Sequence, residues 1–485
     1  MDAQQWKKRN TCIVTALSLM ALGWILPAPN GLSRGAVQVT GIFAGTLLLW
    51  LTVAIDWPSV LCLAMLFLVD GLKPDVVLKS SLGSSTFAFL LFTFLCTYAL
   101  SKTEFVRRCA VFFILNPILG HSPRVILIRY LLCVLLLGLF MSPTVLFVLC
   151  LPIHEEICAL LHLKKGDRLG TALMTGMAFC CALSSGMTPI GHVFPVMAMG
   201  FYETATKMTV SYGAYMAFAL PIGFLCFLFL LGLIFWGLRP DLNAFSAFDG
   251  KRWARQPEAM SSREKKTVAV FFLVVALWLA PTFLKPLFPA FAKGLSELGT
   301  AFPPMVGAVL LLILTDLKQP LLTFSDGCAK GIGWGSMMMA ASTLALGAAM
   351  THADIGLTDY LSGRIANAVL GWEPMLLVFI FTLWAAVQTN VSSNMVTITV
   401  VCTAALPIVL ASEGRISAPA VASLVGMMGA FAFATPPSHP NIALAAASGW
   451  VSTRQLLGYG LALMLFSVFV SVFFGYPLAQ AMMGM

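Results

Sequence analysis

Four short polar interruptions in otherwise apolar stretches carry the residues that could do chemistry. Two of them present hydroxyl and amide groups: Ser142 and Thr144 in one stretch, and Thr389, Ser393 and Asn394 in another. Neutral oxygens of this kind are ligands that hard cations such as Na⁺ prefer. Thr389 and Ser393 are four residues apart, so on a helix they share a face and could bind one ion together. The alternative is that these hydroxyls hydrogen-bond their own helix backbone.

The other two interruptions share the pattern T-P-x-x-H, which ends at His192 in one and at His439 in the other. We expect helices to unwind at Ser184–Gly191 and at Thr435–Pro440, because proline keeps a helix broken. Helix ends there offer free N–H groups to an anion and free C=O groups to a cation. No Lys or Arg lies at any interruption, so neutral donors are expected to hold the anion. The two histidines could carry protons or act as pocket-lining donors.

The stretches that position these residues are long and apolar. The 485 residues are 59% hydrophobic and 10% charged, with a mean hydropathy of +0.91. A soluble domain cannot solvate its surface with so few charges, and apolar runs of about 20 residues can cross a bilayer. The net charge of +9 comes from basic residues that cluster in short loops between apolar runs. The positive-inside rule explains this pattern, so we expect no nucleic-acid partner. These features predict an all-α polytopic membrane protein.

Two halves of the chain repeat the same landmarks. Residues 57–70 match residues 303–316 without gaps, and the T-P-x-x-H pattern recurs at nearly the same interval. Because the shared residues are Pro, Asp, Thr and His, they favour an internal duplication over chance similarity between apolar helices. The predicted organisation is a leading transmembrane helix at 1–34, a first repeat at 35–238, a linker at 239–266 and a second repeat at 267–485.

Each repeat contains one long apolar segment that we expect to enter and leave the membrane on the same side. These segments are 124–162 and 373–411, and basic residues flank the first at both ends. Each repeat then has an odd number of crossings, so the second repeat is inverted. The prediction is 11 transmembrane helices plus two re-entrant hairpins. The N-terminus and the basic linker are expected in the cytoplasm and the C-terminus outside, in a multi-pass protein of the cell (inner or plasma) membrane.

These landmarks resemble the divalent anion/sodium symporter family, which carries dicarboxylates, citrate or sulfate. That family has a Ser-Asn-Thr motif at each hairpin tip. Its counterparts here are Ser142-Pro143-Thr144 and Ser393-Asn394-Met395. The stretches Gly186–Gly191 and Ala434–Pro437 are similar to the family's two unwound loops. The resemblance covers most of the chain in the correct order.

The resemblance implies sodium-coupled symport of a small divalent anion, either a dicarboxylate, a tricarboxylate or sulfate. It also implies an elevator mechanism, and a homodimer in the lipid bilayer. The alternative function is an anion exchanger or a proton-coupled anion transporter without sodium dependence. An enzyme is not expected, because the sequence offers no nucleophile–base pair and no metal-binding cluster.

The resemblance further implies the ligands at the matching positions. The anion is expected at Ser142, Pro143, Thr144, Thr188, Pro189, Ser393, Asn394, Met395, Thr435 and Pro436. Sodium is expected at Ser142, Pro143, Ser185, Gly186, Thr389, Ser393, Asn394 and Ala434. Pro143 stands where the family has Asn, and Met395 where it has Thr. We therefore expect the cation site of the second repeat to be retained in preference to the first.

Overall fold

The chain folds almost entirely into helices. The computed structural model describes residues 3–29, 31–115, 122–190, 192–247, 259–284, 286–317, 319–357, 360, 372–391, 393–412 and 414–484. Within these ranges the strands are β1 (Thr315–Asp316) and β2 (Gln319–Pro320), which pair antiparallel. The predicted helical class is confirmed for this part of the chain.

Serine residues mark the start of several helices in the first half. Ser33, Ser84 and Ser211 each accept a hydrogen bond from a backbone N–H of the first turn, which satisfies a donor that the helix leaves free. The elements up to residue 247 are α1 (Ala3–Ile25), α2 (Arg34–Thr52), α3 (Trp57–Leu66), α4 (Pro74–Ser80), α5 (Ser85–Ser101), α6 (Phe105–Leu115), α7 (Pro123–Gly138), α8 (Pro143–Leu160), α9 (Arg168–Met187), α10 (Val193–Thr206), α11 (Tyr212–Gly232), η2 (Leu233–Leu238) and η3 (Leu242–Ala247).

In the second half, Ser452 and Gln455 form a reciprocal capping box at the start of the helix Thr453–Val470. Beyond the two strands, its elements are α13 (Ser262–Leu284), α14 (Pro289–Glu297), α15 (Phe302–Ile313), α16 (Phe324–Asp326), η4 (Gly327–Gly331), α17 (Trp334–Met350), α19 (Pro374–Val391), α20 (Asn394–Leu410), α21 (Ala418–Ala430), η5 (Pro436–Ser438), α22 (Pro440–Ala447), α23 (Thr453–Val470), η6 (Ser471–Gly475) and α24 (Tyr476–Met483).

In both halves two helices joined by a short connection, called a hairpin below, are followed by a broken helix, and the re-entrant path of the hairpins stays a prediction. The hairpins are α7 with α8 and α19 with α20, and the broken helices are α9 with α10 and α21 with α22. Each hairpin packs against the broken helix that follows it, since α7 and α8 contact α9, and α19 and α20 contact α21. The two broken helices also touch each other through α10 and α21. The hairpins and breaks therefore form one packed unit.

The first break is shorter than predicted. Ser184, Ser185 and Gly186 were expected to be unwound, but α9 remains helical to Met187. The hydroxyl of Ser184 donates to the Cys181 carbonyl, and that of Ser185 donates to the Ala182 carbonyl, so both are satisfied inside the helix. The helix ends only at Thr188, which is extended because it precedes a proline.

Several helices are long and apolar enough to cross a membrane. Among the described residues there are 7 such helices, or up to 9 if each of two bent pairs counts as one span. One bent pair is α14 with α15 and the other joins Phe324–Gly331 to α17, each bent by 77°. The multi-pass character is thus supported, whereas the figure of eleven crossings stays a prediction.

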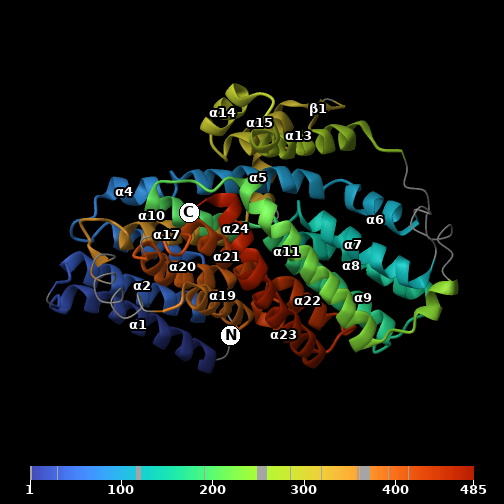
Figure 1. The fold of residues 1–485 in the computed structure, drawn as a ribbon, viewed down its shortest axis with the longest axis horizontal. Helices are drawn as coiled ribbons and strands as arrows, with labels where there is room; N and C mark the ends of the chain where they lie inside the picture. The colour runs from blue at the N-terminus through green and yellow to red at the C-terminus, as the bar shows by residue number, and fades with distance from the viewer. Residues whose placement is uncertain are drawn as a thin grey trace.

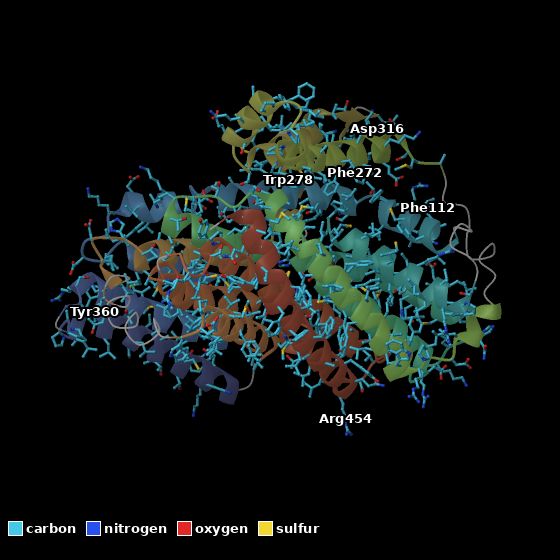
Figure 2. All side chains as sticks on the ribbon, in the orientation of Figure 1. Phe112, Phe272, Trp278, Asp316, Tyr360 and Arg454 are labelled. Atoms are coloured by element: carbon cyan, nitrogen blue, oxygen red, sulfur yellow. The ribbon has the colours of Figure 1, made fainter. Side chains whose placement is uncertain are left out.

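Large apolar side chains cover the outer surface. Phe112 is 63% exposed and Trp236 is 80% exposed, while Arg454 lies near the start of α23 at one end of the molecule (Figure 2). Extended apolar surface of this kind is unfavourable in water and favourable against lipid. By contrast, every residue of α21 and every residue of α9 after Arg168 is buried. The polar breaks are therefore located in the centre of the protein.

The two halves exchange packing partners. In the first half α3 packs against α17 of the second half, and α15 of the second half packs against α5 of the first. Figure 1 shows α13, α14 and α15 as a layer that projects beyond α5, while α1 and α2 lie at another edge of the molecule. Each half thus completes its packing with a helix from the other.

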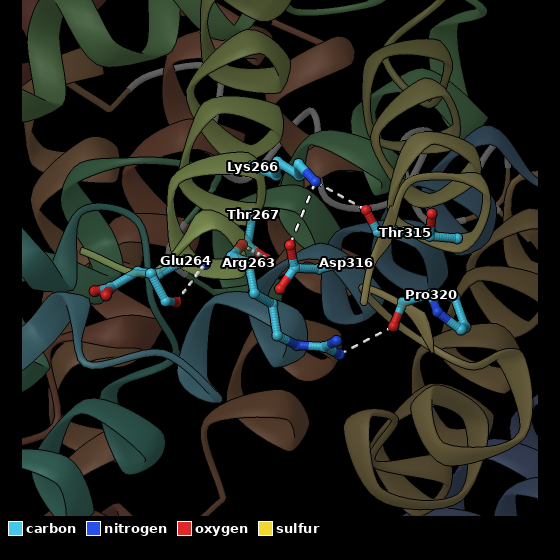
Figure 3. A network of polar contacts seen from close by, with 8 residues as sticks. Arg263, Glu264, Lys266, Thr267, Thr315, Asp316 and Pro320 are labelled. Carbon is cyan, nitrogen blue, oxygen red and sulfur yellow. Dashed lines mark hydrogen bonds and ion pairs between the residues drawn. The ribbon is translucent and has the colours of Figure 1, made fainter. Parts of the chain in front are cut away.

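Two aspartates at matching positions are anchored in the same manner. Asp70, after α3, pairs with Arg34 at the start of α2, with Nε and Oδ2 at 3.4 Å. Asp316, after α15, pairs with Lys266 in the first turns of α13, with Nζ and Oδ1 also at 3.4 Å (Figure 3). In the second half Arg263 adds a hydrogen bond to the Pro320 carbonyl. These contacts fix the loop after each short helix to the first helix of the same half.

Candidate functional site

Each hairpin tip places a serine at the start of its second helix. Ser142 is the N-cap of α8 and Ser393 is the N-cap of α20, and both are extended with no side-chain capping bond. Pro143 follows Ser142, which suits the first position of a helix because no N–H is needed there. Two helix N-termini, with their free N–H groups and positive dipole ends, are thereby presented at the tips.

The threonine of each T-P pattern ties its break to the neighbouring hairpin. The hydroxyl of Thr188 donates to the Leu139 carbonyl at 2.5 Å, and that of Thr435 donates to the Asn390 carbonyl at 2.6 Å. Leu139 lies three residues before Ser142 and Asn390 lies three residues before Ser393. The same contact therefore forms at the same register in both halves.

Asn390 organises the second break, which begins earlier than predicted. The expected unwinding at Thr435–Pro440 starts instead after Ala430, where α21 ends. The Asn390 side-chain oxygen accepts from the N–H groups of Phe433 at 2.7 Å and Ala434 at 2.8 Å. Its amide nitrogen donates to the carbonyls of Phe431 at 3.0 Å and Ala386 at 2.8 Å. One buried side chain thus replaces the helical hydrogen bonds that the unwound stretch has lost.

The first break is satisfied by different groups. Leu139 occupies the position that Asn390 holds in the second half and offers no polar side chain. Instead the Tyr215 hydroxyl, from α11, donates to the Gly186 carbonyl at 2.7 Å. The two breaks are therefore alike in backbone path but differ in the side chains that hold them.

A cavity of about 410 Å³ lies beside the tips and breaks. Its wall combines both halves, because Ser142 and Thr144 enter it from α8 and Ser393, Asn394 and Met395 from α20. The breaks contribute His192, Ser438 and His439, and the helices outside this unit contribute Thr97, Tyr98, Ser101, Lys330 and Ser336. The cavity is large enough for a small anion, and its wall combines apolar side chains with hydroxyl, amide, imidazole and ammonium groups.

Asn394 is a buried polar group in this cavity whose hydrogen-bonding capacity the described protein leaves unmet. Its side chain is 4% exposed, and neither Nδ2 nor Oδ1 has a hydrogen-bond partner in the described part of the chain. A buried amide left unpaired costs about 1–3 kcal/mol for each group, so such residues are expected where a ligand completes the bonding.

The remaining predicted ligands lie behind the cavity wall. Thr389 donates to the Gly429 carbonyl at 2.7 Å and Ser185 bonds its own helix. The residues that do not line the cavity are Pro143, Ser185, Gly186, Thr188, Pro189, Thr389, Ala434, Thr435 and Pro436. The structure thus brings together five of the predicted positions at the cavity, Ser142, Thr144, Ser393, Asn394 and Met395, and the others do not line it. Ligand roles at all of these positions stay predictions.

The cavity also contains a charge that sequence reasoning missed. We expected a pocket lined only by neutral groups, but Lys330 lines it from η4. The Lys330 ammonium pairs with Asp326 at 2.7 Å, and the Tyr98 hydroxyl donates to the same carboxylate at 2.9 Å. Lys330 escaped notice because it is far from the four interruptions in sequence. The signal that was available is a lysine four residues after an aspartate, just before an apolar helix.

The polar groups near the breaks suit a hard monovalent cation better than a transition metal. In the part of the chain that the structure describes, no three His, Cys, Asp or Glu side chains are grouped to hold a metal ion. The available donors are hydroxyl, amide and carbonyl oxygens, which are the ligands that hard cations prefer.

A close backbone contact supports the second break from α23. A Cβ added at Gly460 would lie 2.6 Å from the Cα of Ala434 and 2.8 Å from its nitrogen. We expect Gly460→Ala to lower the unfolding free energy by about 1–3 kcal/mol, because backbone cannot move away as a side chain can. Gly458→Ala on the same helix is the control, since nothing lies within 4 Å of that position. Thermal unfolding of the two variants in detergent compares them, and equal melting temperatures contradict the prediction.

Comparison with known proteins identifies the family. A model described as "Sodium:sulfate symporter transmembrane region" matches residues 7–484. The sodium-dependent dicarboxylate transporter SdcS of Staphylococcus saprophyticus is 24% identical over 96% of this chain and 90% of its own length. SdcS of Staphylococcus aureus (strain USA300) is 23% identical over 94% of this chain and 88% of its own.

The fold is also similar to a solved transporter. The crystal structure of the Alcanivorax borkumensis YdaH transporter matches with a TM-score of 0.54 and 15% identity, over 83% of this chain and 88% of that one. This likeness concerns the fold alone. The family match confirms the resemblance inferred from the hairpin and break motifs, and it confirms a transporter in place of an enzyme. Because the family model spans nearly the whole sequence, the chain belongs to the sodium:sulfate symporter family.

Proposed function

We propose that this chain couples the movement of sodium to the transport of a small divalent anion, either a dicarboxylate, a tricarboxylate or sulfate. The observation that carries the proposal is Asn394, a buried amide with no protein partner among the described residues, at a helix N-terminus that faces a cavity. The sodium:sulfate family and the sodium-dependent dicarboxylate relatives support the same assignment.

The anion is proposed to bind between the two hairpin tips. Ser142 and Thr144 from one tip, and Ser393 and Asn394 from the other, are the donors that line the cavity. Met395 adds an apolar surface. The N-termini of α8 and α20 supply positive dipole ends beside these neutral donors. The deeper residues Pro143, Thr188, Pro189, Thr435 and Pro436 are proposed to shape the tips and breaks around it.

Sodium is a co-transported substrate, and the site of the second half suits it better. We assign it to Thr389, Ser393, Asn394 and the Ala434 carbonyl. In support, the Asn394 oxygen is unpartnered in the part of the chain that is described, and the Ser393 hydroxyl makes no capping bond. The counterpart in the first half, at Ser142, Pro143, Ser185 and Gly186, is weaker. There the Ser185 hydroxyl bonds its own helix and the Gly186 carbonyl accepts from Tyr215.

The two halves are proposed to be inverted repeats. The leading helix is 1–34, the repeats are 35–238 and 267–485, and the cytoplasmic linker is 239–266, of which 248–258 lies outside the described residues. Matched contacts support the duplication. They include the Thr188 and Thr435 bonds to the hairpins, the Asp70 and Asp316 ion pairs, and the exchanged packing of α3 and α15.

Transport is proposed to occur by an elevator movement within a homodimer. The hairpins and broken helices form one packed unit, and the cavity lies between this unit and residues of α5, η4 and α17. A ligand bound at that boundary can be carried across the membrane when the packed unit moves relative to α5, η4 and α17. The protein is proposed to have 11 crossings and two re-entrant hairpins in the cell membrane, with a cytoplasmic N-terminus and an external C-terminus.

Uptake into proteoliposomes tests the proposal. We expect an inward sodium gradient to raise the initial uptake of labelled succinate or sulfate on the order of tenfold over choline, since binding of the two ligands is coupled. Protein-free vesicles are the control. Counterflow that proceeds equally without sodium, at neutral and at acid pH, identifies an obligate exchanger and defeats the sodium assignment.

A further inference from the structure

The cavity holds a pair of imidazoles, one from each half. His192 is the residue before α10 and His439 is the residue before α22. Their ring centroids are 5.9 Å apart, and both rings line the cavity. Each follows the Thr-Pro of its own break, so the pair sits at the meeting point of the two broken helices. The two rings lie edge to face, and both border the cavity, so a small dianion in the cavity can be reached from both.

Both rings have unmet hydrogen-bonding capacity. His439 is 2% exposed, and within the described ranges neither of its ring nitrogens has a hydrogen-bond partner. The Nδ1 atom of His192 is likewise buried and unpartnered there. The ring centroids of Phe194 and His192 are 3.9 Å apart, and the Asn441 side chain interacts with the His439 ring without reaching hydrogen-bond geometry. Buried imidazoles left in this state point to a ligand that bonds them.

The surroundings are electropositive. Each ring lies at the N-terminal, positive end of a helix, and Lys330 lines the same cavity. Of the described cavity residues, Tyr98 is the other titratable group, and none is a carboxylate. The Asp326 carboxylate bonds Lys330 and Tyr98 from behind. Two imidazolium ions are therefore disfavoured in the empty cavity and favoured once a dianion lies between them.

Other ionisable groups on the elements packed against α10 and α22 lie outside the cavity wall. Glu155 accepts from the Trp450 indole at the far end of α22, and Glu203 lies at the opposite end of α10 from His192. The remaining described groups on these elements are His154 and Glu156 on α8, Arg168 on α9, Tyr202 on α10, Arg454 and Tyr459 on α23, and cysteines on α5, α8, α9 and α20. None of them lines the cavity with the pair.

We propose that His192 and His439 bind the transported anion together and take up a proton from solution as they do so. The inference rests on the proposed function, because it adds a proton to the same anion site. By linkage, a ligand that favours the protonated pair binds more tightly at low pH. Anion affinity should therefore fall as the pH rises.

Isothermal titration calorimetry tests this on the purified full-length protein in sodium-containing detergent solution. Sulfate and succinate are titrated near pH 7 in buffers of different ionisation enthalpy, so that the heat reports the protons exchanged. Sulfate remains a dianion throughout, which separates protonation of the protein from protonation of the ligand. We expect uptake of a substantial fraction of a proton, up to about one, for each sulfate bound. Sulfate binding without proton uptake overturns the proposal.

Variants locate the proton on the pair. We expect His192→Gln/His439→Gln to lose proton uptake and to weaken sulfate binding on the order of tenfold, since charge-assisted hydrogen bonds are replaced by neutral ones. His352→Gln is the control, because His352 is not part of the cavity. Proton uptake that persists in the double variant overturns the proposal. If the variant does not fold, the wild-type measurement still decides.

The outcomes separate this inference from the proposed function. If sulfate and succinate both fail to bind the wild-type protein, the anion site itself is wrong and both proposals fall. If an anion binds with proton uptake but sodium changes neither its affinity nor its transport, the sodium-coupling proposal is wrong and the proposal for the imidazole pair is retained. If sodium stimulates transport and no proton is taken up, the pair is wrong and sodium coupling stands.

Discussion

Asn394→Ala is expected to abolish sodium-stimulated anion uptake while the protein stays folded. The Asn394 side chain makes no hydrogen bond to the described protein, so its removal breaks no hydrogen bond of the folded state. In the proposed site it bonds both the anion and the cation. Hydrogen bonds to charged groups contribute about 1.5–3 kcal/mol each, so losing two weakens coupled binding on the order of 100-fold or more.

Uptake into proteoliposomes and thermal unfolding in detergent measure the two parts of this prediction. The variant should melt at or above the wild-type temperature, because an unsatisfied buried amide has been removed. Asn394→Asp is an informative companion, since a carboxylate retains an oxygen for sodium but repels the anion. Sodium-stimulated uptake at the wild-type rate in Asn394→Ala removes the basis of the site assignment.

Asn390→Leu, unlike Asn394→Ala, is expected to destabilise the fold. The free energy of unfolding should fall by several kcal/mol. Leucine has the same branched shape as asparagine, with larger terminal groups, but leaves the Phe433 and Ala434 N–H groups and the Phe431 carbonyl without the partner that Asn390 gives them. Each buried backbone group left unpaired costs about 1–3 kcal/mol.

The melting temperature of Asn390→Leu measures this effect, with Asn394→Ala as the matched control four residues away. The prediction is contradicted if Asn390→Leu has the same melting temperature as the wild type. Comparison of the two variants separates a residue that maintains the break from one that serves the ligand, although both are buried asparagines in the same hairpin.

The sequence predicted the arrangement of the site better than its details. Hairpins and breaks were found because Pro143, Pro189 and Pro436 interrupt apolar runs, and proline has a local effect that needs no tertiary information. The order of hairpin and broken helix in both halves followed from the repeated T-P-x-x-H pattern. The family was recognisable from the residues Ser142-Pro143-Thr144 and Ser393-Asn394-Met395.

What the sequence missed depends on tertiary contacts. Ser184, Ser185 and Gly186 are helical because the hydroxyls bond back to their own helix, a choice that composition does not settle. The second break starts at Phe431 because Asn390, distant in sequence, replaces the helical bonds. Lys330 reaches the cavity only through the packing of η4 against α5.

The exchange of α3 and α15 between the halves has a consequence for biogenesis. When the ribosome has made only the first half, α3 has no α17 to contact and α5 has no α15. Both helices must wait in the bilayer or at the insertion machinery without these packing partners. A nascent chain truncated after the linker is therefore expected to be recognised by quality-control proteases, and the two halves expressed as separate polypeptides should protect each other from degradation.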